Sequence, residues 1–131
     1  MKSNQANDSN NPTASASSAP PNPCVERAAN TVALKAVADD GTSYLLPYSQ
    51  FLYAEKIPNP VLEKEPDAPP EKMLIRFACA DVVILGSGLK RLEQDIQKYE
   101  LKFVKSADRR FATTLKTHIA ALTITLTKEN V

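Results

Sequence analysis

An apolar run at residues 73–85 constrains the fold of this chain more than any other stretch. Only Arg76 and Asp81 interrupt it, and residues 82–84 are all β-branched. β-Branched side chains pack well on a pleated surface but lose rotamer freedom in a helix. The run has neither a period of 3.6 nor strict alternation, so it predicts either one long bent strand or two short strands broken near residues 79–81. Because the run is apolar on both faces, we expect cover on both sides of it.

A glycine turn and an amphipathic helix follow this run. The turn Gly86-Ser87-Gly88 is predicted to end the strand, with Ser87 as the N-cap of the helix. Four apolar side chains then recur at helical spacing, which places Leu89, Leu92, Ile96 and Tyr99 on one stripe. The helix is expected to end near Glu100, because Leu101 and Phe103 then alternate with a lysine, as in a strand with one buried face.

Further strand signals lie on both sides of this central stretch. Residues 31–46, with a turn signal at 39–42, predict a hairpin. Residues 118–127 alternate between apolar and small polar side chains, which predicts a closing strand. The predicted buried face of that strand consists of Ala120, Leu122, Ile124 and Leu126. Residues 48–57 predict either a short helix or another strand, and residues 106–116 either a short helix or an ordered loop.

The chain divides into a polar tail and one folded domain. Residues 1–24 are rich in Asn, Ser, Ala and Pro and cannot bury enough surface to offset their ordering entropy, so we expect them to be disordered. Residues 25–131 are expected to form a single small domain with an acidic, proline-rich loop at 58–71. A single helix cannot cover both faces of a parallel sheet. The element order therefore predicts an α+β fold: a small, mainly antiparallel sheet or open barrel with one main amphipathic helix.

Composition and charge restrict the chemistry. The net charge is +1, so no global field favours a nucleic-acid, membrane or acidic partner. Charge is nevertheless uneven, because residues 86–131 contain nine Lys and Arg against five Asp and Glu. Two cysteines and one histidine are too few for a metal site, and we expect no cofactor. Cys79 is interpreted as a small buried hydrophobe, Cys24 as part of the polar tail, and His118 as a surface or capping residue.

No catalytic motif is recognised in the sequence. The strand, Gly-x-Gly and helix at residues 82–92 look like the start of a dinucleotide-binding fold, but Arg91 stands where its third glycine belongs. No lysine follows a glycine loop in the P-loop pattern. The pair Asp39-Asp40 lies in a turn, where Asp is favoured for backbone reasons alone. We therefore expect no catalytic residues, and an enzyme whose site residues are distant in sequence is the third of three hypotheses.

The leading hypothesis is a small, non-catalytic interaction or assembly module. Sheet edges present unpaired N–H and C=O groups to another chain, so we expect a protein partner, either a second copy or another protein. No apolar stretch reaches the ~18 residues that a membrane helix requires, which predicts no membrane partner. No apolar segment follows Lys2 as a secretory signal would require, so we expect a cytoplasmic protein.

The alternative hypothesis is nucleic-acid or polyanion binding by the basic C-terminal half. Lys90 and Arg91 fall in the first turn of the predicted helix, where the helix dipole disfavours cations by about 0.3–1 kcal/mol each. An anion docked there would turn this unfavourable pair into a binding site, because helix starts bind anions readily. The predicted site consists of Gly86, Ser87, Gly88, Lys90, Arg91, Lys102, Lys105, Arg109 and Arg110.

Overall fold

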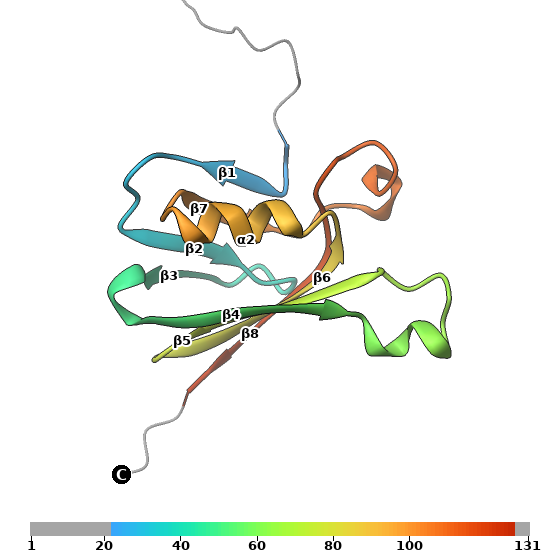
Figure 1. Cartoon of the computed structure of the whole chain (residues 1–131), viewed down its shortest axis with the longest axis horizontal. Helices are drawn as coiled ribbons and strands as arrows, with labels where there is room; N and C mark the ends of the chain where they lie inside the picture. The colour runs from blue at the N-terminus through green and yellow to red at the C-terminus, as the bar shows by residue number, and fades with distance from the viewer. Residues whose placement is uncertain (1–21, 128–131) are drawn as a thin grey trace, which may run out of the picture.

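Two four-stranded sheets and one α-helix form the structure, a computed structural model that describes residues 22–127 (Figure 1). In spatial order, the first sheet contains β1 (Val25–Arg27), β7 (Leu101–Lys105), β2 (Ala33–Val37) and β3 (Ser43–Pro47). The second sheet contains β4 (Phe51–Pro58), β5 (Glu71–Phe77), β6 (Ala80–Ser87) and β8 (His118–Leu126). The helix α2 is Lys90–Gln97, and short 3-10 helices are η2 (Tyr48–Gln50), η3 (Pro60–Glu63) and η4 (Arg109–Phe111).

The predicted α+β class is confirmed. Strand pairing is antiparallel except between β2 and β7, which run parallel, and neither sheet closes into a barrel. The elements divide into two open sheets because the chain crosses from one to the other at η2, directly after Pro47 ends β3. Among residues 22–127, no helix has the length and apolar character needed to span a bilayer.

The apolar run forms a hairpin of β5 and β6, which is the second of the two predicted arrangements. The strands separate at Ala78 and Cys79, close to the predicted break. Burial alternates along both strands: Ile75 is fully buried, for example, whereas Leu74 beside it is half-buried. The expectation of cover on both faces was therefore wrong, because the outer-face apolar side chains of both strands are only half-buried.

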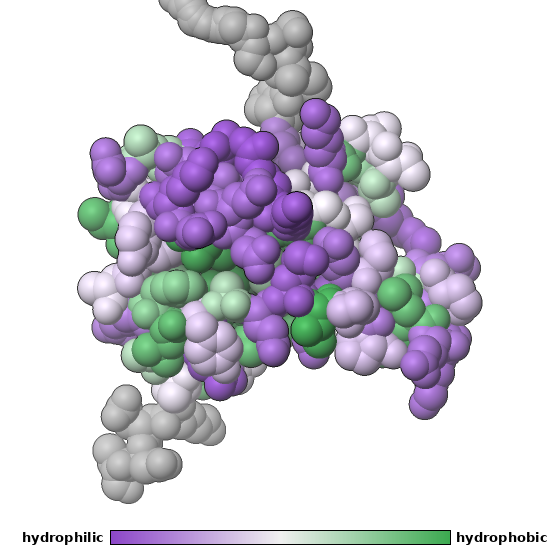
Figure 2. All heavy atoms as spheres, in the orientation of Figure 1, coloured by the Kyte–Doolittle hydropathy of each residue, from purple (hydrophilic) through white to green (hydrophobic). Residues whose placement is uncertain are grey.

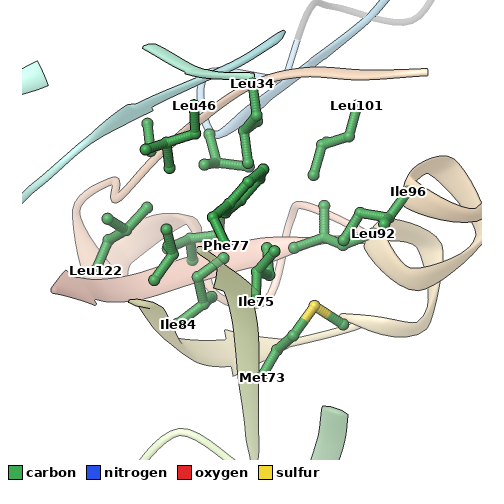
Figure 3. Packing of buried hydrophobic residues seen from close by; sticks show 14 of the residues in the cluster. Leu34, Leu46, Met73, Ile75, Phe77, Ile84, Leu92, Ile96, Leu101 and Leu122 are labelled. Atoms are coloured by element: carbon green, nitrogen blue, oxygen red, sulfur yellow. The ribbon is translucent and has the colours of Figure 1, made fainter. Parts of the chain in front are cut away.

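The hydrophobic core lies between the two sheets, and α2 closes one side of it (Figures 1 and 3). The first sheet contributes Leu34, Leu46 and Leu101; the second contributes Met73, Ile75, Phe77, Ile84 and Leu122; and α2 contributes Leu92 and Ile96. Phe77 lies in the middle of this group in Figure 3, and its ring packs at 5.8 and 6.0 Å, between centroids, from the rings of Phe51 and Tyr48. Burying large aromatic side chains is a dominant stabilising contribution in a domain of this size.

The glycine turn has a different role from the predicted one. Ser87 is the last residue of β6, and Leu89 is the N-cap of α2 without a side-chain cap bond, so the prediction that Ser87 caps the helix was wrong. Both glycines instead allow the backbone of residues 116–119 to pass close by. A Cβ on Gly86 would lie 2.0 Å from the carbonyl oxygen of His118, and one on Gly88 would lie 1.8 Å from that of Lys116.

The helix α2 buries most of its predicted stripe. Leu89, Leu92 and Ile96 are buried, and hydrophilic side chains gather over the exposed side of the helix (Figure 2). The helix ends at Gln97, earlier than predicted, and Tyr99 adopts a left-handed conformation with φ of 55°. The residue is 52% exposed and its ring packs edge-on against Tyr48, so Tyr99 is not part of the buried stripe.

Irregularities in strand register change which side chains face the core. The pairing of β1 with β7 shifts by one residue, so β7 buries Leu101 and Val104 rather than the predicted Leu101 and Phe103. A second shift, between β6 and β8, leads β8 to bury Ile119 and Leu122 and leaves Ala120 half-buried. A bulge moves every later side chain to the opposite face, and simple alternation cannot locate it.

The remaining segments match the sequence in part. β2 and β3 form the predicted hairpin, with Leu34 opposite Leu46. Residues 48–57 form η2 followed by most of β4, and residues 106–116 form a loop that contains η4. The predicted tail, residues 1–24, lies outside the described residues except for 22–24, which belong to the fold.

The prediction for Cys24 as part of the polar tail was wrong, whereas Cys79 is a partly buried side chain packed against the core. Cys24 is fully buried, and its Sγ accepts the N–H of Ile119 at 3.4 Å, whereas Cys79 lies half-buried in the β5–β6 turn. Burial raises the pKa of the Cys24 thiol. Both thiols are free.

The close crossing at Gly86 predicts a steric effect on stability. Gly86→Ala should lower the free energy of unfolding by about 3 kcal/mol or more, because the added methyl must push β6 away from β8. The control is Gly41→Ala, where nothing lies within 4 Å of the added carbon and only the φ of 92° is unfavourable, at a cost of about 1–2 kcal/mol. Urea denaturation measures both; equal losses would contradict the steric explanation.

Thiol accessibility provides a second prediction. In the folded protein a thiol reagent should modify Cys79 first, and Cys24 only as fast as the protein unfolds, since burial both hides its thiol and disfavours the thiolate. In Cys79→Ser, which isolates Cys24, the labelling rate should rise with urea in step with unfolding. Fast labelling of Cys24 without denaturant would contradict its burial.

Candidate functional site

A cavity with a basic lining lies where β1, the start of α2 and the segment before β8 meet. Its volume is about 370 Å³. The charged residues that line it are Arg27, Lys90, Arg91, Asp95 and Lys116. We call it the basic cavity, because four cations in its lining face a single carboxylate.

Asp95 holds the two arginines of the basic cavity. Its side chain is 2% exposed, and its Oδ1 accepts the Nε–H of Arg27 at 2.9 Å and that of Arg91 at 3.3 Å. Hydrogen bonds between ionised groups are among the stronger ones in proteins, although both guanidinium groups are about half exposed and therefore partly screened. One carboxylate thus fixes the orientation of two guanidinium groups at the cavity wall.

Only one of these two ion pairs joins residues that are close in sequence. Arg91 and Asp95 are four residues apart on one helix, where side chains meet. Arg27 comes from β1, 68 positions away from Asp95, and reaches it because β1 pairs with β7, the strand that follows α2. Its Nη2 also lies 3.5 Å from Oε1 of Glu100.

Both lysines of the basic cavity are exposed. Lys90 begins α2, and Lys116 arrives with the segment that crosses Gly88. Neither ammonium group makes an ion pair with another residue in the range 22–127.

The backbone amides of the glycine turn are largely engaged. The N–H of Leu89 donates to Oε1 of Glu71 at 2.8 Å, and Gly86 and Ser87 pair with β8. A carboxylate thus already lies at the position where the sequence suggested an external anion. The amides of this turn consequently contribute little to anion binding, and the cationic side chains must supply most of it.

The structure places six of the nine predicted site residues in two different cavities and the other three outside both. Gly88, Lys90 and Arg91 line the basic cavity. Gly86, Ser87 and Arg109 line a second cavity. Lys102, Lys105 and Arg110 line neither, and the guanidinium group of Arg110 lies 5.0 Å from the ring centroid of Phe111. Anion binding by this set remains a prediction, but no single cavity contains all nine residues.

The second cavity, which we call the loop cavity, lies between the acidic loop of residues 65–70 and the η4 region. Its volume is about 860 Å³. His118 is part of its lining and is 2% exposed, so of the two predicted roles, a surface or a capping residue, the surface role was wrong. Its Nε2 lies 3.0 Å from the carbonyl oxygen of Ala107 and 3.1 Å from that of Asp108, so the N–H on Nε2 is the donor. The imidazole thereby attaches the loop before η4 to β8.

The side chains with potential for acid–base chemistry have structural partners. Asp81 accepts two bonds from the guanidinium group of Arg76, at 2.9 and 2.8 Å, and the pKa of Arg76 is raised chiefly by this contact. In the part of the chain that the structure describes, no group of three or more His, Cys, Asp or Glu side chains is positioned to hold a metal ion.

A third feature is the outer edge of β8. The N–H of Thr127 donates to the carbonyl oxygen of Cys79 at 2.9 Å. Hydrogen-bonded and non-hydrogen-bonded pairs alternate along an antiparallel ladder, so this bond identifies the residues of β8 that hydrogen-bond to β6. Leu122, Ile124 and Leu126 therefore turn their N–H and C=O groups away from β6. Asp39 occupies the first of these positions: its carboxylate accepts the N–H of Leu122 at 3.1 Å, and its own N–H donates to the Leu122 carbonyl at 3.0 Å. The groups of Ile124 and Leu126 have no partner among the described residues.

Comparison with known proteins adds no family to this description: no family model, curated protein or solved structure matches the chain. The candidate sites are therefore argued from their geometry alone.

The two ion pairs of Asp95 should differ in their contribution to stability. Arg27→Ala removes a contact between β1 and α2 and should lower the free energy of unfolding by about 1–2 kcal/mol. Arg91→Ala removes a local contact within α2 and should cost about 0.5 kcal/mol. Urea denaturation of the two variants side by side measures the difference, and a larger loss in Arg91→Ala would contradict it.

Proposed function

We propose that this protein is a small, non-catalytic interaction module that joins a second copy of itself by strand addition at the free edge of β8. The observation that carries the proposal is the pair of residues Ile124 and Leu126, whose outward backbone groups lack partners within residues 22–127. Leu126 is also 52% exposed, so an apolar side chain lies beside these groups. Unpaired edge groups beside an apolar side chain favour pairing with another strand.

The other sheet edges carry features that oppose strand addition. On β3 the last residue whose backbone N–H position points away from the sheet is Pro47, and on β4 it is Pro58. Proline has no N–H to offer, so it interrupts a ladder on the side where it faces out. The edge strand β1 is only three residues long. The end of β8 lacks such a feature, which is why we assign the contact to it.

A second copy fits this edge by symmetry. Two β8 strands that run antiparallel about a two-fold axis at Thr125 place Ile124 of each copy opposite Leu126 of the other. Each free N–H group then faces a free C=O group, and the two second sheets become one continuous sheet. The contact is short, so we expect a weak dimer that forms as the protein concentration rises.

Sedimentation velocity from about 10 µM to about 1 mM protein tests the proposal. The mass should rise from monomer toward dimer. Leu126→Pro should remain monomeric and folded, because the N–H that it removes has no partner among residues 22–127. Leu126→Lys should also weaken the dimer, since an edge lysine opposes strand pairing.

The matched control is Thr123→Lys, which places the same charge on the same strand at a residue whose N–H already pairs with β6. It should dimerise like the unmodified protein. Circular dichroism confirms that each variant is folded. A strict monomer over the whole range, or a dimer that both Leu126 variants leave intact, would refute strand addition at β8.

A further inference from the structure

We infer that the basic cavity binds a single phosphate group, either free phosphate or the phosphate of a small phosphorylated molecule. This inference is independent of strand addition at β8, which lies on a different part of the fold. It is carried by the cationic side chains of the cavity and by the buried carboxylate that orients two of them.

The first step of the argument is the orientation of the arginines. Both donate to Oδ1 of Asp95 through Nε, so the contact with the carboxylate occupies only the Nε–H of each guanidinium group. The terminal nitrogens of Arg91 have no hydrogen-bond partner among residues 22–127. A guanidinium fork held in place by a buried carboxylate is well suited to the planar, two-point recognition of a phosphate.

The second step is the uncompensated charge. Lys90 and Lys116 come from two segments that meet at Gly88, and neither has an ion pair within the described range. Together with the arginines they place four positive charges in the lining, against Asp95 in the lining and Glu100 beside Arg27. Like charges around one cavity repel one another, and an anion between them removes that repulsion. A phosphate dianion has the sign and the charge to do so.

The third step is size. A volume of about 370 Å³ is at the lower end of the range for small-molecule sites. A nucleic-acid strand needs a track of cations along several phosphates. Lys102, Lys105 and Arg110 lie outside the cavity, so the basic side chains that would extend such a track are not gathered here. The geometry therefore favours one phosphate group over a strand.

Titration calorimetry of the full chain at low and moderate salt tests the inference. Its probes are inorganic phosphate, a nucleoside monophosphate and a single-stranded oligonucleotide without terminal phosphates. Phosphate and the monophosphate should bind at low salt and weaken as salt rises. If free phosphate is the natural ligand, phosphate and the monophosphate should bind with similar affinity. If the natural ligand is a phosphorylated molecule, the monophosphate should bind more tightly than phosphate. The oligonucleotide should bind no more tightly than phosphate.

The decisive variant combines Lys90→Gln with Lys116→Gln, which leaves the Asp95 contacts and the core intact. It should weaken binding of phosphate and of the monophosphate at least about tenfold. Lys98→Gln is the control: it removes one charge at the far end of α2, outside the cavity, and should leave binding unchanged. Thermal unfolding confirms that the variants remain folded.

Three results would overturn the inference. The first is that neither phosphate nor the monophosphate binds at low salt. The second is an equal loss of binding in Lys98→Gln and in the double variant, which would mean that only the overall charge matters. The third is tight oligonucleotide binding without phosphate binding, which would assign the surface to a nucleic-acid strand instead.

Discussion

The backbone of residues 116–119 crosses the β6–α2 connection more closely than any side chain would permit, and the rest of the fold depends on this contact. Only glycine at positions 86 and 88 leaves room for the carbonyl oxygens of His118 and Lys116. Thr117 secures the crossing by donating its hydroxyl hydrogen to the carbonyl of Gly88 at 2.9 Å. The crossing sets where β8 joins the second sheet and brings Lys116 to the start of α2. It also separates the two cavities, since Gly86 lines the loop cavity and Gly88 the basic cavity.

A buried charge is the second constraint on this domain. Asp95 is almost inaccessible, and its Oδ2 has no hydrogen-bond partner within residues 22–127. The arginines compensate the charge from the solvent side. On the inner side, burial first and the charge of Asp95 second raise the pKa of Tyr48, so this phenol stays protonated and donates to the carbonyl of Leu101. A buried carboxylate is costly unless it is paired. Its presence on a helix that otherwise buries leucine and isoleucine is consistent with a role in orienting the arginines.

Sheet edges show how the domain limits unwanted strand pairing. Pro47 and Pro58 stand at outward positions of β3 and β4, and Asp39 caps the outward groups of Leu122 on β8. Each device removes or satisfies backbone groups that another strand would use. The strand order places β3, β4 and β8 at sheet edges, and each of them has five or more residues. These are therefore the edges at which prolines or a capping carboxylate limit strand pairing. The end of β8 therefore differs from the other edges in chemistry as well as in position.

The sequence by itself determined the features that arise from neighbours in the chain. Hydrophobic period and turn residues identified the β2–β3 hairpin, the two-strand alternative for residues 73–85, the helix with its buried Leu92 and Ile96, and the α+β class. They also placed Lys90 and Arg91 at the start of that helix.

Only the tertiary structure decided features that join distant residues: the pairing of Arg27 with Asp95, the burial of Cys24 and His118, and the role of the two glycines. Register shifts in β7 and β8 likewise depend on partner strands. Local patterns report which face of an element is apolar, whereas the packing of non-adjacent elements selects the side chains that meet, and with them the residues that form each cavity.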